Sequence, residues 1–128
     1  MAISIVRLGS PRLKNEGVRI GTVRRPPRGV PRAEFASRDF YDVWLPTLAP
    51  SEPLLKMGLA SADERAWRRF AQRFRAEMNR PDARRVLDLL AALSQSSDFS
   101  VGCYCEDERR CHRSLLRELL SARNARMR

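Results

Sequence analysis

The stretch FSVGCYCEDERRCHRSLLRELL, residues 99–120, decides how we interpret the fold. Its first residues carry Phe, Val, Tyr and Cys and predict a strand over Phe99–Cys105. An acidic loop follows, and leucines at helical spacing then predict a helix from Cys111 to about Arg126. The order strand, loop, helix places this loop at the carboxyl end of a strand, where α/β folds bind their ligands.

All three cysteines of the chain (Cys103, Cys105 and Cys111) and its only histidine, His112, lie in this stretch. A helix N-terminus and neighbouring arginines favour a thiolate, so Cys105 or Cys111 is a candidate nucleophile, with His112 beside it. The same four residues are a weaker candidate for a zinc site, because Cys-x-Cys-x5-Cys-His is not ordinary zinc-finger spacing; we predict no metal and no other cofactor. The alternative without chemistry is that each thiol is a small buried hydrophobe.

The segments upstream extend the same pattern of strands and helices. Ser61 with Glu64 three residues later predicts a capping box, and Pro81 suits the first turn of the next helix. Strands separated by helices predict a small three-layer α/β domain, with a short, mainly parallel sheet flanked by helices. The remaining predicted elements are strands at Ala2–Val6 and Val18–Val23, a short helical segment within Phe40–Leu48, and a helix over Ser61–Asn79.

Length and composition agree with one folded domain over residues 1–128. The chain has 128 residues, of which 43% are hydrophobic, so a packed core is expected. No apolar run is long enough for a membrane span, the start lacks a signal peptide, and three cysteines are an odd number for a disulfide framework. We therefore expect a cytoplasmic protein without a membrane partner, with residues 121–128 as a basic tail that frays.

The net charge of +10 comes almost entirely from arginine. Guanidinium groups bind phosphates and carboxylates in a bidentate manner, which indicates a small anion or a nucleic acid as the partner. Arg19, Arg24, Arg28 and Arg113 are the candidate anion-binding residues, because the prolines of RRPPRGVPR (24–32) stiffen the loop that carries two of them. The alternatives are a solvated arginine surface, or internal ion pairs of these arginines with acidic residues such as Glu77 and Glu106.

Four segments in order resemble the DUF488 family, in particular its YeaO-like branch, which is uncharacterised. They are GVRIGTVRRPPRGV (17–30), WLPTLAPSEPLLK (44–56), FAQRFRAEM (70–78) and CYCEDERRCHR (103–113), and together they span most of the domain. Val23 and Pro26 stand where that branch carries an acidic residue and a tryptophan. The resemblance implies a compact α/β domain in which the Arg-Pro loop and the Cys-His-Arg turn lie near each other. It implies no reaction.

The function that we predict from the sequence is the binding of a small anion or a nucleic-acid phosphate between these two segments. The first alternative is a thiol-based enzyme or redox sensor that uses Cys105 or Cys111. The second is a structural or partner-binding protein without a ligand site. Neither a substrate nor an oligomeric state is predicted.

Overall fold

The computed structural model describes residues 1–59 and 63–128 and has one sheet of four parallel strands. The spatial order is β1 (Ile3–Arg7), β4 (Phe99–Cys103), β2 (Val18–Gly21) and β3 (Val43–Trp44). All residues of β4 are buried, as expected for a central parallel strand. Together with four helices, this sheet makes a small α/β domain and confirms the predicted fold class.

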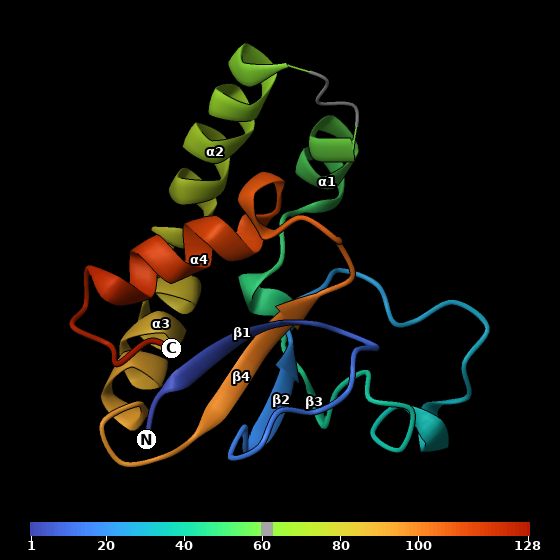
Figure 1. Cartoon of the computed structure of the whole chain (residues 1–128). Helices are drawn as coiled ribbons and strands as arrows, with labels where there is room; N and C mark the ends of the chain where they lie inside the picture. The colour runs from blue at the N-terminus through green and yellow to red at the C-terminus, as the bar shows by residue number, and fades with distance from the viewer. Residues whose placement is uncertain (60–62) are drawn as a thin grey trace.

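The helices are α1 (Glu52–Leu59), α2 (Glu64–Met78), α3 (Pro81–Leu93) and α4 (His112–Ser121). Figure 1 shows α2, α3 and α4 grouped beside the sheet, while the long segment between β2 and β3 runs on its other side. Pro81 occupies the first turn of α3 as predicted. The cap of α2 is Asp63, whose carboxylate accepts from the Ala66 amide at 2.8 Å, and Ser61 lies outside the described residues.

The prediction of a helical segment within Phe40–Leu48 is wrong in its first half. Val43 and Trp44 form β3 and lie in register with Ile20 and Gly21 of β2. Only Pro46–Leu48 is helical, as one 3₁₀ turn. The aromatic residues suggested a helix, but the edge of β2 offers main-chain partners that a local pattern cannot reveal.

The ends of several elements also differ from the prediction, among them β2, which ends at Gly21 rather than at Val23. The strand β4 ends at Cys103, and α4 ends at Ser121 rather than near Arg126, because the chain turns at Asn124 with φ of +61°. The residues after this turn, which we expected to fray, run beside β1, where the Ile3 amide donates to the Arg126 carbonyl at 2.8 Å. Among the described residues, no helix is long and apolar enough to cross a membrane.

Two apolar clusters fill the interior. The larger joins the helices to the sheet and contains Phe74, Leu87, Val101 and Leu116. The smaller lies at the carboxyl end of the strands and contains two of the three thiols; its buried members are Val6, Leu8, Val23, Tyr41, Cys103 and Cys111. The fold therefore places the cysteine cluster inside the protein at the predicted edge of the sheet.

Candidate functional site

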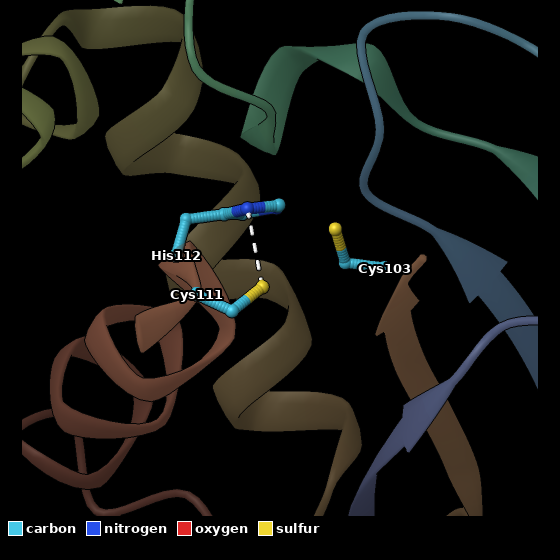
Figure 2. Close-up of side chains that lie close together, drawn as sticks. All are labelled: Cys103, Cys111 and His112. Carbon is cyan, nitrogen blue, oxygen red and sulfur yellow. Dashed lines mark hydrogen bonds between the residues drawn. The ribbon is translucent and has the colours of Figure 1, made fainter. Parts of the chain in front are cut away.

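The candidate site forms where β4 ends and α4 begins. Cys103 is the last residue of β4, and Cys111 is the residue that precedes α4. In Figure 2 the side chains of Cys103, Cys111 and His112 point toward one another, and their sulfur and nitrogen atoms lie within 4.8 Å of one another. All three residues are buried. The structure thus brings together residues from the two ends of the acidic loop.

Cys105 is the member of the cluster that reaches the surface. Its residue is exposed, whereas Cys103 and Cys111 are buried and Cys111 is only 2% exposed. The Cys105 sulfur lies 3.8 Å from the Cys103 sulfur. The cluster therefore has one sulfur open to solvent and two sulfurs behind it.

The protonation of His112 follows from its hydrogen bonds. Its Nε2 lies 2.7 Å from the main-chain carbonyl oxygen of Thr22, which can only accept, so Nε2 carries a proton. In the neutral ring Nδ1 then holds a lone pair, and this atom lies 3.7 Å from the Cys111 sulfur. The ring is tilted against Phe74 of α2, with the centroids 5.5 Å apart. Packing and hydrogen bonding together fix the imidazole as a base that faces a thiol.

Arg113 is directed inward and faces the same sulfur. It is 3% exposed; its Nε donates to the Cys111 sulfur at 3.3 Å, and Nη1 donates to the Val6 carbonyl at 2.8 Å. Its Nη2 donates to the carbonyl of Cys105. Among the described residues, none of these partners is a carboxylate, so the guanidinium has no acidic counter-ion.

The pKa values of the three thiols are shifted in different directions. Hydrogen bonds from the thiols of Cys103 and Cys105 lower the pKa of Cys111, burial opposes them, and His112 assists them. The pKa of Cys103 is raised by its hydrogen bonds to the other two sulfurs and by burial. For Cys105, the bond with Cys103 lowers the pKa, but the bond to Cys111 and burial leave it raised overall. The cluster therefore favours a single thiolate, at Cys111.

A metal ion fits this donor set only with movement. Three sulfurs and an imidazole nitrogen are donors that zinc prefers, and ligands around tetrahedral zinc with bonds of about 2.3 Å lie about 3.8 Å apart. The Cys103–Cys105 separation and the 3.7 Å between the Cys111 sulfur and His112 Nδ1 are close to this value, whereas the atoms of Cys103, Cys111 and His112 together are held only within 4.8 Å of one another. Metal binding thus stays the weaker alternative that the sequence indicated.

The four candidate anion-binding arginines do not come together. Arg19 is fully buried and binds Glu16, Arg24 donates to the carbonyls of Pro46, Ala49 and Pro50, and Arg113 faces Cys111. Of the four, only Arg28 is exposed and has no partner among the described residues; it lies beside Phe40 and Tyr104 in a hollow of about 360 Å³. None of five surface hollows formed by the described residues is lined by two of the four. Anion binding by these residues stays a prediction.

The acidic residues expected as their partners bind other groups. Glu77 accepts from the amide and the hydroxyl of Ser51, and Glu106 lies 3.6 Å from Arg7. The Arg-Pro loop does approach the cysteine turn, as the resemblance implies, since the Tyr104 hydroxyl donates to the Arg25 carbonyl at 2.9 Å.

Sequence reasoning missed two residues that shape the interior. Thr22 orients His112 through its main-chain oxygen, which leaves no trace in side-chain chemistry. Glu16 is the partner of Arg19, and the only local signal for that pair is their separation of three residues, from an irregular loop to the start of β2.

Comparison with known families yields one match. A family model described as "DUF488-N3a: Active DUF488-N3 subclade" matches residues 3–124, which include the whole cysteine loop. Neither the curated proteins nor the solved structures gave a significant match.

Proposed function

This chain belongs to the DUF488 family, and from that premise we propose that its cysteine cluster is a thiol–disulfide redox centre. In this centre Cys111 is the thiolate, Cys105 is the sulfur that meets an oxidant, and His112 carries the proton. The word "Active" in the description of the matching subclade is in line with a working site. Anion binding by the four candidate arginines is not proposed, because the guanidinium groups of three of them donate to partners within the protein.

The observation that carries the proposal is the buried charge of Arg113. A guanidinium removed from water needs an anion beside it, because an uncompensated buried charge is strongly unfavourable. Its contacts are two carbonyl oxygens and the Cys111 sulfur at 3.3 Å. Of these only the sulfur can become an anion, so the thiolate at Cys111 completes an ion pair with Arg113.

The surrounding groups provide a path for the proton. When the Cys105 sulfur attacks the O–O bond of a peroxide, its proton passes to the Cys111 thiolate of the same cluster. His112 Nδ1, 3.7 Å from that sulfur, then takes this proton and restores the thiolate. Cys105 becomes a sulfenic acid, and the other peroxide oxygen takes a proton from solvent, which reaches exposed Cys105, and leaves as water or an alcohol.

The second step closes the disulfide. The Cys111 thiolate attacks the sulfur of the sulfenic acid, and the S–O bond breaks. The released hydroxide takes the proton held by His112 and leaves as water. Two thiols have then given two electrons to the peroxide, and a Cys105–Cys111 disulfide has formed. A reductant of the dithiol class returns the pair to its starting state.

The test follows the disulfide by mass spectrometry after a limited dose of hydrogen peroxide. In the wild type we expect the Cys105–Cys111 pair, with Cys103 left as a free thiol. The Cys103→Ser variant is the matched control in the same cluster and retains the pair. In Cys111→Ser, Cys105 accumulates as a sulfenic or sulfinic acid that a sulfenic-acid probe or mass detects.

A titration of thiolate absorbance against pH measures the second part of the proposal. One thiolate should persist far below the ordinary thiol pKa of about 8.5 and disappear in Cys111→Ser. If all thiols titrate at ordinary pH, or if peroxide oxidises wild type and Cys111→Ser identically, the redox centre is rejected.

A further inference from the structure

Unpaired positive charge gathers on one helix. Arg65, Arg68, Arg69 and Arg73 of α2 are exposed, and none has an ion-pair or hydrogen-bond partner among the described residues. Many arginines elsewhere are paired, as Arg25 is with Glu52. The charge on this face of α2 is therefore not neutralised within the molecule.

The acidic residues of α2 do not offset this charge, because each has a partner elsewhere. Glu64 binds Arg110 at 2.9 Å, and Glu77 binds Ser51. Arg75, a further arginine of α2, pairs with Glu118 of α4 at 2.9 Å. The unpaired charged groups on the exposed face of α2 are thus guanidinium groups.

The arginines form a stripe. Arg65, Arg69 and Arg73 are separated by four residues each, so they follow one side of the helix at steps of about 6 Å. The buried face of α2 carries Phe70 and Phe74 on the opposite side. Further unpaired and exposed arginines continue onto the start of α3, at Arg80, Arg84 and Arg85.

The guanidinium groups of the stripe indicate which class of partner it binds. Planar guanidinium groups bind phosphates in a bidentate manner, and a row of them suits a regular row of anions. Single strands are bound largely by stacking on exposed aromatic rings, but the aromatic rings of α2 stack on one another, with Trp67 and Phe70 5.3 Å apart. A membrane surface would require exposed apolar residues on the same helix, and in α2, all of which is described, no large hydrophobic side chain is exposed.

We propose that the exposed face of α2 is a docking surface for the phosphate backbone of duplex DNA. Backbone contacts of this type carry no sequence information, so the binding is independent of sequence and falls steeply with salt. The surface is independent of the thiol chemistry proposed above, since none of its residues belongs to the cysteine cluster.

The test compares two triple variants of the full chain with equal charge. Arg65→Gln, Arg69→Gln, Arg73→Gln removes the stripe, and Arg32→Gln, Arg38→Gln, Arg126→Gln removes three other exposed arginines whose side chains also lack partners among the described residues. Fluorescence anisotropy with a labelled duplex of mixed sequence gives the affinity at several salt concentrations. Thermal melting verifies that both variants are folded.

We expect the stripe variant to lose more than tenfold in affinity at low salt, and its salt slope to fall by about 3, since each phosphate contact contributes about 0.9. The control variant should change little in comparison. The inference is overturned if the wild type binds no duplex at low salt, if the control loses as much as the stripe variant, or if polyglutamate binds as tightly as the duplex.

Discussion

Arg19 and Arg113 are both buried arginines, yet they have different counter-ions. Arg19 lies on β2, is fully buried and binds both carboxylate oxygens of Glu16, at 2.7 and 2.8 Å. Its remaining donors reach the main-chain carbonyls of Ser10, Pro11 and Asp39. Arg113 reaches two carbonyls and the Cys111 sulfur. The first pair is permanently charged at neutral pH, whereas the second is charged only while the sulfur is a thiolate.

This difference separates a structural ion pair from the pair that we propose to be reactive. The Glu16 carboxylate accepts hydrogen bonds from Arg19, from Ser100 and from the Leu13 amide. These bonds attach a loop to the sheet. A thiolate beside Arg113 can be oxidised, alkylated or protonated, and each event removes the counter-ion of the arginine. In the proposed redox centre, the same type of cation that fixes the loop at Glu16 stabilises a thiolate that can react.

The largest effect is expected from Glu16→Gln. This change keeps the shape of the side chain but leaves Arg19 buried without a counter-ion, which costs about 3–5 kcal/mol of unfolding free energy. Urea denaturation measures the loss. Glu34→Gln is the control, because Glu34 is exposed and pairs with no arginine among the described residues. Equal stability of both variants would mean that the Arg19 pair contributes nothing.

The Arg19–Glu16 pair also leads us to predict how the stability of the protein depends on pH. Burial raises the pKa of Glu16, but the hydrogen bonds from Arg19, Leu13 and Ser100 outweigh it and lower the value from 4.5 to about 2. A lowered pKa contributes stability above the unfolded value, and this contribution is lost as pH falls from about 4.5 toward 2. We expect about 3 kcal/mol to disappear over this range. Urea denaturation at several pH values should show this slope in the wild type and a weaker slope in Glu16→Gln.

A third experiment asks whether Arg113 needs an anion at all. Asp and Asn have nearly the same shape, so Cys111→Asp supplies a carboxylate to Arg113 whereas Cys111→Asn does not. We expect the Asp variant to be more stable by about 1–3 kcal/mol at neutral pH. The same two changes at exposed Cys105 are the control and should differ much less. An Asn variant as stable as the Asp variant would remove the argument for the Cys111 thiolate.

The sequence predicted the place of the cysteine cluster better than its electrostatics. Cysteines and a histidine on both sides of one strand-to-helix loop indicate a site, because the topology of an α/β sheet determines where that loop lies. The orientation of Arg113 could not be predicted, since its inward position depends on the Val6 carbonyl of a strand more than a hundred residues away in the chain. Two-residue β3 was missed for the same reason: it exists only because β2 offers an edge.

The smallest expected effect comes from a substitution that tests the hydroxyl of Thr22 and leaves its main-chain carbonyl oxygen in place. The Thr22 hydroxyl donates to the Gly102 carbonyl at 3.0 Å and lies 3.4 Å from His112 Nε2, whereas the Thr22 carbonyl oxygen lies 2.7 Å from that nitrogen. Thr22→Val removes only the hydroxyl and should cost about 0.5–1.5 kcal/mol in urea denaturation, the usual contribution of one hydrogen bond.

Thiolate absorbance should nevertheless titrate in Thr22→Val as it does in the wild type. The main-chain carbonyl still holds the Nε2 proton, so Nδ1 keeps its lone pair toward Cys111. His112→Phe is the matched control, because it removes Nδ1 and should raise the pKa of Cys111. If Thr22→Val raises that pKa as much as His112→Phe does, the hydroxyl orients the imidazole. In that case the contact between His112 Nε2 and the Thr22 carbonyl oxygen, which no sequence pattern encodes, does not orient the imidazole toward Cys111.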